Sequence, residues 1–251
     1  MHDSHSVVME TERMLRRVRV IETGSYKDSS NLEYEETTIK EELEEDEVLV
    51  SVEACGVCFR DIIDREGGNP FLNVPISLGH EIAGQIIKSN ASEWKVGDRV
   101  VSLHGVQCGS CNYCSCGDDP RCMQRPDYLY GLTHNGGYQT ILPMHGKSIV
   151  KFPANISYSE ACFLNCTAAV ALRGLKHHGK INDDKVVLIT GASGGVGVHA
   201  IQVAKAYGAF VIAITSNPSK EGFLRELGAD KVIISKENSF HQEGLLFLKI
   251  N

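Results

Sequence analysis

Five of the nine cysteines of this 251-residue chain lie between Cys108 and Cys122, in the stretch CGSCNYCSCGDDPRC. A disulfide cluster, a redox site and a metal site are the three kinds of structure that would use so many thiols in one short loop. The spacing C-x2-C-x2-C-x7-C lets four thiolates converge on one tetrahedral ion, at about 2.3 Å from zinc. We therefore expect a closed structural zinc site, with Cys116 left over as a bystander thiol. Its expected ligands are Cys108, Cys111, Cys114 and Cys122.

The N-terminal segment favours the metal site over the disulfide cluster. The first twenty residues mix acidic residues with arginines and lack an apolar stretch, so they do not form a secretory signal. Asp3, Glu10 and Glu12 also disfavour a transit peptide. We therefore expect a cytoplasmic protein, in which thiols stay reduced and disulfides explain the cysteines poorly.

Composition and charge narrow the classes of partner. The chain is 42% hydrophobic and 23% charged, which is ordinary for a globular protein. Its formal net charge of −7 disfavours a nucleic-acid partner, and with it a nucleic-acid-binding zinc knuckle. No apolar run is long enough to cross a bilayer. We expect a small-molecule substrate, and neither nucleic acid nor a membrane as partner.

A second group of ligand-type residues is spread over the distant segments GVCFRD, GHE and NCTAAV. Cys58, His80 and Cys166 are the thiols and the imidazole in these segments. Two thiolates and one imidazole are a ligand set that an open, catalytic zinc accepts. A lone cysteine on a helix is more often a small buried hydrophobe, so the prediction rests on the three residues together.

The elements expected to position these residues change in character near residue 155. Before it, the runs EVLVSVEAC, EIAGQIIKS and DRVVSL predict strands separated by turns rich in Gly, Pro, Asn and Asp. Residues 157–179 read as one helix that ends at Gly179. KVVLIT, AFVIAIT and DKVIIS then alternate with two helical segments, which predicts a parallel sheet with right-handed crossovers. The predicted fold class is a β-rich domain followed by an α/β domain.

The stretch GASGGVG lies between a predicted strand and a predicted helix, which is the context of a dinucleotide-binding loop. The helix N-terminus supplies amides for the phosphates. Gly194 would let the backbone approach the pyrophosphate, and Gly197 would allow close packing of helix on strand. The expected cofactor-binding residues of the loop are Gly191, Ala192, Ser193, Gly194, Gly195, Val196 and Gly197.

The end of the second α/β strand bears on the choice of cofactor. An NAD enzyme places Asp or Glu there for the ribose hydroxyls, whereas this chain reads ITSNPSK. Thr215, Ser216 and Lys220 are candidates to bind a 2′-phosphate, which favours NADPH over NADH. The alternative, that Ser216 and Ser219 serve only the turn and the helix cap, stays open.

These motifs together resemble the zinc-containing medium-chain dehydrogenase/reductases, the alcohol dehydrogenase superfamily. The resemblance extends from about Arg17 to Ser235 and is carried by GVCFRD, GHE, VGDRV, the four-cysteine loop, GGY, the helix with Cys166 and GASGGVG. It implies a chaperonin-10-like catalytic domain, a Rossmann domain, and one catalytic and one structural zinc. Among the residues around the catalytic zinc, it implies Cys58, His80 and Cys166 as ligands, Glu81 as an occasional ligand, and Asp61 as the carboxylate that orients His80.

One position departs from the alcohol dehydrogenases of this family. The second residue after the first zinc cysteine is usually Ser or Thr and relays the proton of the alcohol, but here it is Arg60. A permanently charged guanidinium is a poor proton relay. The aromatic-Arg-Asp triplet is similar to the branch that contains acryloyl-coenzyme A reductases, and the glycine-rich segment is also similar to quinone oxidoreductases. Cys55 and Cys58 form a C-x-x-C pair, but in the family only the second is a ligand.

The expected domain organisation is a tail (1–16), the catalytic domain (17–156), a connecting helical region (157–184) and a partial Rossmann domain (185–251). Only one half of a dinucleotide fold is visible, so we expect an alternative or truncated C-terminus. The expected function is zinc-dependent, NADPH-linked oxidoreduction of a carbonyl, alcohol or activated enoyl compound. The alternative is a catalytically impaired isoform that binds zinc, as a homo-oligomer or paired with full-length subunits.

Overall fold

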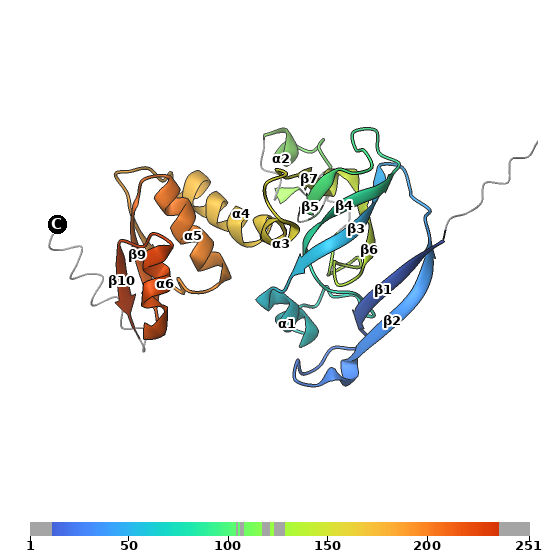
Figure 1. Cartoon of the computed structure of the whole chain (residues 1–251), viewed down its shortest axis with the longest axis horizontal. Coiled ribbons are helices and arrows are strands. Elements are labelled where there is room, and N and C mark those ends of the chain that lie inside the picture. The colour runs from blue at the N-terminus through green and yellow to red at the C-terminus, as the bar shows by residue number, and fades with distance from the viewer. Residues whose placement is uncertain (1–11, 104, 106–107, 117–120, 123–128, 236–251) are drawn as a thin grey trace, which may run out of the picture. The chain divides into compact units, whose positions relative to one another are not determined.

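The computed structural model describes residues 12–103, 105, 108–116, 121–122 and 129–235. The chain divides between Asn165 and Cys166 into two compact units, which are described separately (Figure 1). The strands of the first unit are β1 (Glu12–Val20), β2 (Leu32–Lys40), β3 (Glu47–Gly56), β4 (Glu81–Ser89), β5 (Arg99–Ser102), β6 (Ile141–His145) and β7 (Ile149–Lys151). Its helices are α1 (Phe59–Arg65), α2 (Asn112–Ser115) and α3 (Tyr158–Ala161), with 3-10 turns η1 (Ser29–Asn31), η3 (Gly146–Ser148) and η4 (Cys162–Leu164).

A five-stranded antiparallel sheet of order β6-β3-β4-β5-β7 forms the centre of the first unit. Alternate residues of a strand point to opposite faces. Val48 and Val50 of β3 therefore pack with Ile82 and Ile86 of β4 in one buried cluster. Leu49, between them, joins a second cluster. Residues on both faces of β3 are thus buried, and the sheet holds the ends of β3 and β4 near which the candidate ligands lie.

The strands β1 and β2 form a separate two-stranded antiparallel ribbon, blue in Figure 1. In the register of the two strands Arg17 lies opposite Glu35, and their side chains form an ion pair with Nε 2.7 Å from Oε2. Because β1 begins at Glu12, the expected tail extending to residue 16 is wrong over residues 12–16, which pair with β2. Residues 1–11 of that expected tail lie outside the described residues.

The second unit contains a three-stranded parallel sheet of order β10-β9-β8. Its core combines α5 residues such as Ile201 with Val211 of β9 and Leu224 of α6. The predicted fold class, a β-rich unit followed by a partial Rossmann-like unit, is confirmed. The elements are α4 (Thr167–Leu172), η5 (Arg173–His178), β8 (Val186–Ile189), α5 (Gly195–Ala206), β9 (Phe210–Thr215), η6 (Pro218–Lys220), α6 (Glu221–Glu226) and β10 (Lys231–Ile234).

The single helix expected over residues 157–179 is wrong as a continuous element. It begins as predicted at Ser157, which forms a capping box with Glu160. The helical pieces α3 and η4 end the first unit, and α4 and η5 follow Cys166. Asn165 and Cys166 keep right-handed helical backbone angles but belong to neither η4 nor α4, so the break falls at one of the predicted metal ligands.

Candidate metal and cofactor sites

The four-cysteine loop gathers its thiols as a tetrahedral metal site requires. Potential ligand atoms of Cys108, Cys111, Cys114 and Cys122 all lie within 4.8 Å of one another. The Sγ of Cys114 lies 3.6 Å from that of Cys111 and 3.9 Å from that of Cys108. Four zinc–sulfur bonds of about 2.3 Å in a tetrahedron place the sulfurs about 3.8 Å apart. The residues present therefore fit a structural zinc ion.

Backbone amides prepare some of these thiols for metal binding. Hydrogen bonds from the Ser110 and Cys111 backbone N–H groups lower the pKa of Cys108 to about 6. Partial burial and the neighbouring thiols raise the pKa of Cys114 to about 12. Clustered thiolates repel one another, so all four ionise together only beside a cation. The loop is therefore chemically suited to bind one.

The remaining cysteines fit neither a disulfide nor a redox pair. All nine cysteines of the chain are described, and each is a free thiol. Cys116 lies outside the four-thiol group, and its Sγ donates to the Tyr113 carbonyl at 3.2 Å. Burial raises the pKa of Cys55, which disfavours the thiolate that disulfide exchange needs.

A second group of ligand-type atoms involves distant parts of the sequence. Potential ligand atoms of Cys58, His80, Glu81 and Cys166 all lie within 4.8 Å of one another. Cys58 is the N-cap of α1, Glu81 begins β4, and Cys166 is bonded directly to the last residue of the first unit. The side chain of His80 is 2% exposed, and Glu81 is almost completely buried. Thiolates with one imidazole and one carboxylate form a donor set that fits an open zinc site.

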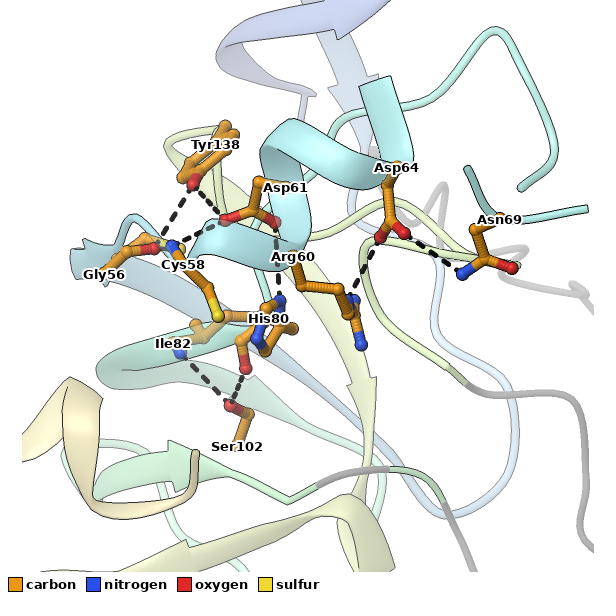
Figure 2. A network of polar contacts seen from close by, with 11 residues as sticks. Gly56, Cys58, Arg60, Asp61, Asp64, Asn69, His80, Ile82, Ser102 and Tyr138 are labelled. Carbon is orange, nitrogen blue, oxygen red and sulfur yellow. Dashed lines mark hydrogen bonds and ion pairs between the residues drawn. The ribbon is translucent and has the colours of Figure 1, made fainter. Parts of the chain in front are cut away.

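Asp61 contacts two members of this group, Cys58 and His80, and also Tyr138 (Figure 2). Its Oδ2 accepts hydrogen bonds from the Cys58 backbone N–H at 2.8 Å and the Tyr138 hydroxyl at 2.7 Å. Its Oδ1 lies 3.4 Å from Nδ1 of His80. Burial alone would raise the pKa of Asp61, but the bonds from His80, Tyr138 and Cys58 lower it. An ionised Asp61 favours a proton on Nδ1 of His80 and leaves Nε2 with its lone pair for a metal.

Two polar residues of this region were not singled out by the sequence analysis. Burial and the Asp61 carboxylate raise the pKa of Tyr138, so it stays a hydrogen-bond donor. The Ser102 hydroxyl donates to the His80 carbonyl at 2.9 Å and accepts from the Ile82 N–H at 3.1 Å, which fixes the backbone on both sides of Glu81 (Figure 2). The GGY motif contains Tyr138 and is the one sequence pattern that pointed to this residue. No sequence pattern pointed to Ser102.

Gly56, at the end of β3, is required for space rather than for backbone flexibility. A Cβ at this position would overlap a carboxylate oxygen of Glu81 and lie 2.9 Å from a ring carbon of Phe163. Real Cβ atoms essentially never approach so closely. Because Gly56 has no side chain, the Glu81 carboxylate can occupy this space beside Cys58 and His80.

The glycine-rich loop of the second unit forms a tight turn that leads directly into α5. Gly191 has a φ of +59°, and Gly194 is the N-cap of α5. A Cβ on Gly197 would lie 2.6 Å from the Gly191 carbonyl oxygen and from Cα of Ala192, so α5 packs directly on the loop. Ala192 is buried, Gly195 lies against Thr167, and Val196 is 45% exposed. A cavity of about 210 Å³ opens beside the loop, lined by Thr190, Gly191, Ser193, Ile214, Thr215, Ser216 and Ser235.

The residues predicted to bind a 2′-phosphate are not all brought to this cavity. Thr215 lines it but is only 3% exposed, and its hydroxyl lies 3.1 Å from that of Ser193. Ser216 lines the cavity, whereas Lys220 lies outside the lining, with its Nζ 5.9 Å from the centre of the Phe223 ring. Ser219 serves the turn that starts η6, where its N–H and hydroxyl both bond to the Asn217 side chain.

Comparison with known proteins gives two family matches. Residues 44–154 match the family Alcohol dehydrogenase GroES-like domain, and residues 195–244 match Zinc-binding dehydrogenase. The acryloyl-coenzyme A reductase of Sulfurisphaera tokodaii is 37% identical over 196 residues, which are 77% of this chain and 58% of that protein. The NAD-dependent alcohol dehydrogenase of Sulfolobus acidocaldarius is 35% identical over 196 residues, 74% of this chain and 56% of that protein.

The solved structures agree with the sequence matches. The crystal structure of AibC superposes with a TM-score of 0.87 at 33% identity, and the match covers 99% of this chain and 68% of that chain. This chain spans less than two thirds of the length of the first curated relatives that it matches. No helix among the described residues is both long and apolar enough to cross a membrane. The chain belongs to the zinc-containing medium-chain dehydrogenase/reductases, the alcohol dehydrogenase superfamily.

Proposed function

We propose that this chain contains the catalytic zinc site and the adenosine half of the nucleotide site of an NADP(H)-linked oxidoreductase. Its substrate would be a carbonyl, alcohol or activated enoyl compound. The observation that carries the proposal is the convergence of Cys58, His80, Glu81 and Cys166 on one point, with Asp61 behind His80. A relative named acryloyl-coenzyme A reductase adds support for the enoyl class.

In this proposal the residues of the chain hold the metal and orient its ligands. Cys58, His80 and Cys166 would be zinc ligands, and Glu81 stands beside them as an alternative ligand. Asp61 and Tyr138 keep the His80 ring in one orientation and tautomer. When bound, zinc supplies a Lewis acid for a substrate oxygen. NADPH is the expected hydride donor, and the protein contributes orientation.

We assign residues 17–156 to the catalytic domain, 157–184 to the connecting region and 185–251 to the nucleotide domain. The loop of Cys108, Cys111, Cys114 and Cys122 would hold a second, structural zinc. Because that site offers four thiolates and no open position, it would stabilise the catalytic domain and take no part in chemistry.

Metal analysis tests the zinc proposal directly. We expect about two zinc ions per chain in freshly purified protein, one for each ligand group. A Cys58→Ser variant should retain only the ion in the cysteine loop. Purified protein without zinc would refute the proposal. Zinc at both sites without turnover of any carbonyl, quinone or enoyl thioester would instead favour the zinc-binding, catalytically impaired alternative.

NADPH preference is the finer part of the proposal. No acidic residue is among those that line the described cavity beside the glycine-rich loop, so nothing there would repel a 2′-phosphate. We expect NADPH to bind more tightly than NADH. Because Lys220 lies outside the cavity lining, its side chain must turn from the Phe223 ring toward the phosphate to contribute, and Lys220→Ala should then narrow the gap in affinity. A charged contact to phosphate contributes about tenfold to a hundredfold in affinity. Titration of both cofactors measures this, with Lys185→Ala as a charge-matched control at an exposed position.

A further inference from the structure

A cavity of about 480 Å³ lies in the first unit and is lined by residues of β1, β2 and α1. Protein interiors contain few voids larger than a water molecule, and pockets that bind small molecules have volumes of about 300–1,000 Å³. None of the four potential metal ligands of the Cys58 group is among the described residues that line this cavity. Most of its wall consists of aliphatic side chains, those of Val18, Val20, Leu32, Val57, Ile62 and Leu78.

The aliphatic lining extends from buried to exposed positions. Val20 and Leu78 are buried and pack together with Ile76 in one cluster. Val57 is 76% exposed and Val18 is 39% exposed, so the lining also reaches solvent. Exposed apolar side chains beside a concave surface are typical of ligand-binding sites. An apolar molecule can therefore enter from solvent and contact the buried cluster.

Hydrogen bonds fix the walls of the cavity relative to one another. The Gly24 N–H donates to the Arg65 carbonyl at 2.8 Å, and Nε of Arg65 donates to Oδ1 of Asn31 at 3.1 Å. Nη2 of Arg65 donates to the same Asn31 oxygen and to the Asp28 carbonyl. These bonds join the connection between β1 and β2 to α1. The cavity is therefore formed by a braced part of the fold, as ligand pockets usually are.

Charge indicates which kind of molecule fits. The described lining contains one acid, Asp61, and one base, Arg65, so it carries no net charge. Both oxygens of Asp61 face the candidate metal ligands and the Tyr138 hydroxyl (Figure 2), and Arg65 uses Nε and Nη2 for the bonds to the β1–β2 connection. A charged ligand would lose its hydration among the aliphatic side chains and gain no hydrogen bond from these atoms.

We infer that this cavity is a binding site for a neutral, apolar small molecule, with a compact aromatic or alicyclic skeleton. Removal of apolar surface from water drives such binding. The Tyr138 side chain lines the cavity, and its hydroxyl donates to Asp61, so a bound molecule contacts the network beside His80 without reaching the metal group itself. The inference goes beyond the proposed function and does not depend on zinc or on a nicotinamide cofactor.

Two fluorescent probes that differ by one charged group test the site. The full chain is titrated with N-phenyl-1-naphthylamine, which is neutral, and with 1-anilinonaphthalene-8-sulfonate, which has the same skeleton with an added sulfonate. The probes are excited directly. We expect the neutral probe to bind at about one site per chain, and about tenfold or more tightly than the sulfonate. Val18→Trp should fill part of the cavity and weaken binding of the neutral probe by about tenfold or more.

Val150→Trp is the matched control, because Val150 is a strand valine of similar exposure, 43%, outside the cavity lining. Thermal unfolding is measured for every variant. Ile62→Phe narrows the same cavity from α1 and replaces Val18→Trp in the comparison if that variant does not fold. Wild-type protein that does not bind the neutral probe, tighter binding of the sulfonate, or equal binding of the neutral probe by the folded cavity variant and Val150→Trp would each overturn the inference.

Discussion

The two candidate metal groups reach a similar geometry in opposite ways. The loop group takes all four thiols from residues 108–122, and all four are partly exposed. The Cys58 group takes its atoms from three distant segments, and its His80 and Glu81 are buried. Loop thiols are prepared by amides of the loop itself, whereas His80 is oriented by Asp61 of another element. A ligand group within one loop therefore depends mainly on local sequence, while a group gathered from distant segments depends on the surrounding fold.

Loss of a loop cysteine is expected to have the largest effect. Cys111→Ser removes one of four ligands from a loop whose described helix α2 contains no buried residue, and metal-binding free energy is folding free energy in such sites. We expect loss of one zinc ion and a large decrease in the free energy of unfolding. Elemental analysis and denaturant titration measure both. Cys58→Ser should lose the other zinc ion with a smaller decrease in the free energy of unfolding. A larger decrease for Cys58→Ser than for Cys111→Ser would show that the Cys58 group, and not the loop, is the more important for stability.

Gly56→Ala should damage the Cys58 group and spare the loop. The added methyl group overlaps the Glu81 carboxylate and crowds Phe163, and overpacking of a tight site costs about 1–3 kcal/mol. We expect this decrease in unfolding free energy together with weakened zinc binding at the Cys58 group alone. Gly109→Ala is a control that meets no neighbour within 4 Å, although its φ of +73° adds backbone strain. Full zinc binding in Gly56→Ala would contradict the steric account.

Asp61→Asn should lower metal affinity without removing a ligand. Replacing a residue that orients a metal-binding histidine typically weakens metal binding tenfold to a hundredfold. Competition with a chelator measures this at the Cys58 group. The pKa of Asp61 is lowered on folding, so its carboxylate stabilises the protein at neutral pH, and this contribution disappears as the pH falls through the folded pKa. The variant should therefore lose less stability than the wild type as the pH falls. The same loss of stability at low pH in both proteins would show that the Asp61 carboxylate does not stabilise the fold.

Tyr138→Phe is expected to have the smallest effect. It removes one hydrogen bond of 2.7 Å to Asp61 and keeps the aromatic ring, so we expect a decrease of about 1 kcal/mol in unfolding free energy. The same change should move the Asp61 pKa upward, because one of the bonds that lower it is gone. NMR titration of the carboxylate measures the shift. An unchanged or lower pKa would contradict the proposed network.

The nucleotide loop shows which features a local sequence pattern predicts and which it does not. GASGGVG between a strand and a helix predicted both the turn and the tight packing at Gly197, because these depend on neighbours in the sequence. The same pattern did not predict that Thr215 is buried against Ser193, or that Lys220 lies outside the cavity lining. Those placements depend on where β9 ends relative to the loop.

The amino-acid sequence by itself determined the fold class and the four thiols of the loop, since hydrophobic periodicity and a C-x2-C-x2-C-x7-C spacing are local properties. It identified the family through the resemblance of its motifs. The sequence also pointed to Cys58, His80 and Cys166, but through resemblance, and their convergence remained a hypothesis. Only the tertiary structure decided that Tyr138 bonds to Asp61, that Ser102 holds the backbone beside His80, and that Gly56 makes room for Glu81. Each of these contacts joins residues brought together by sheet pairing and core packing, and no local pattern specifies which side chains will then meet.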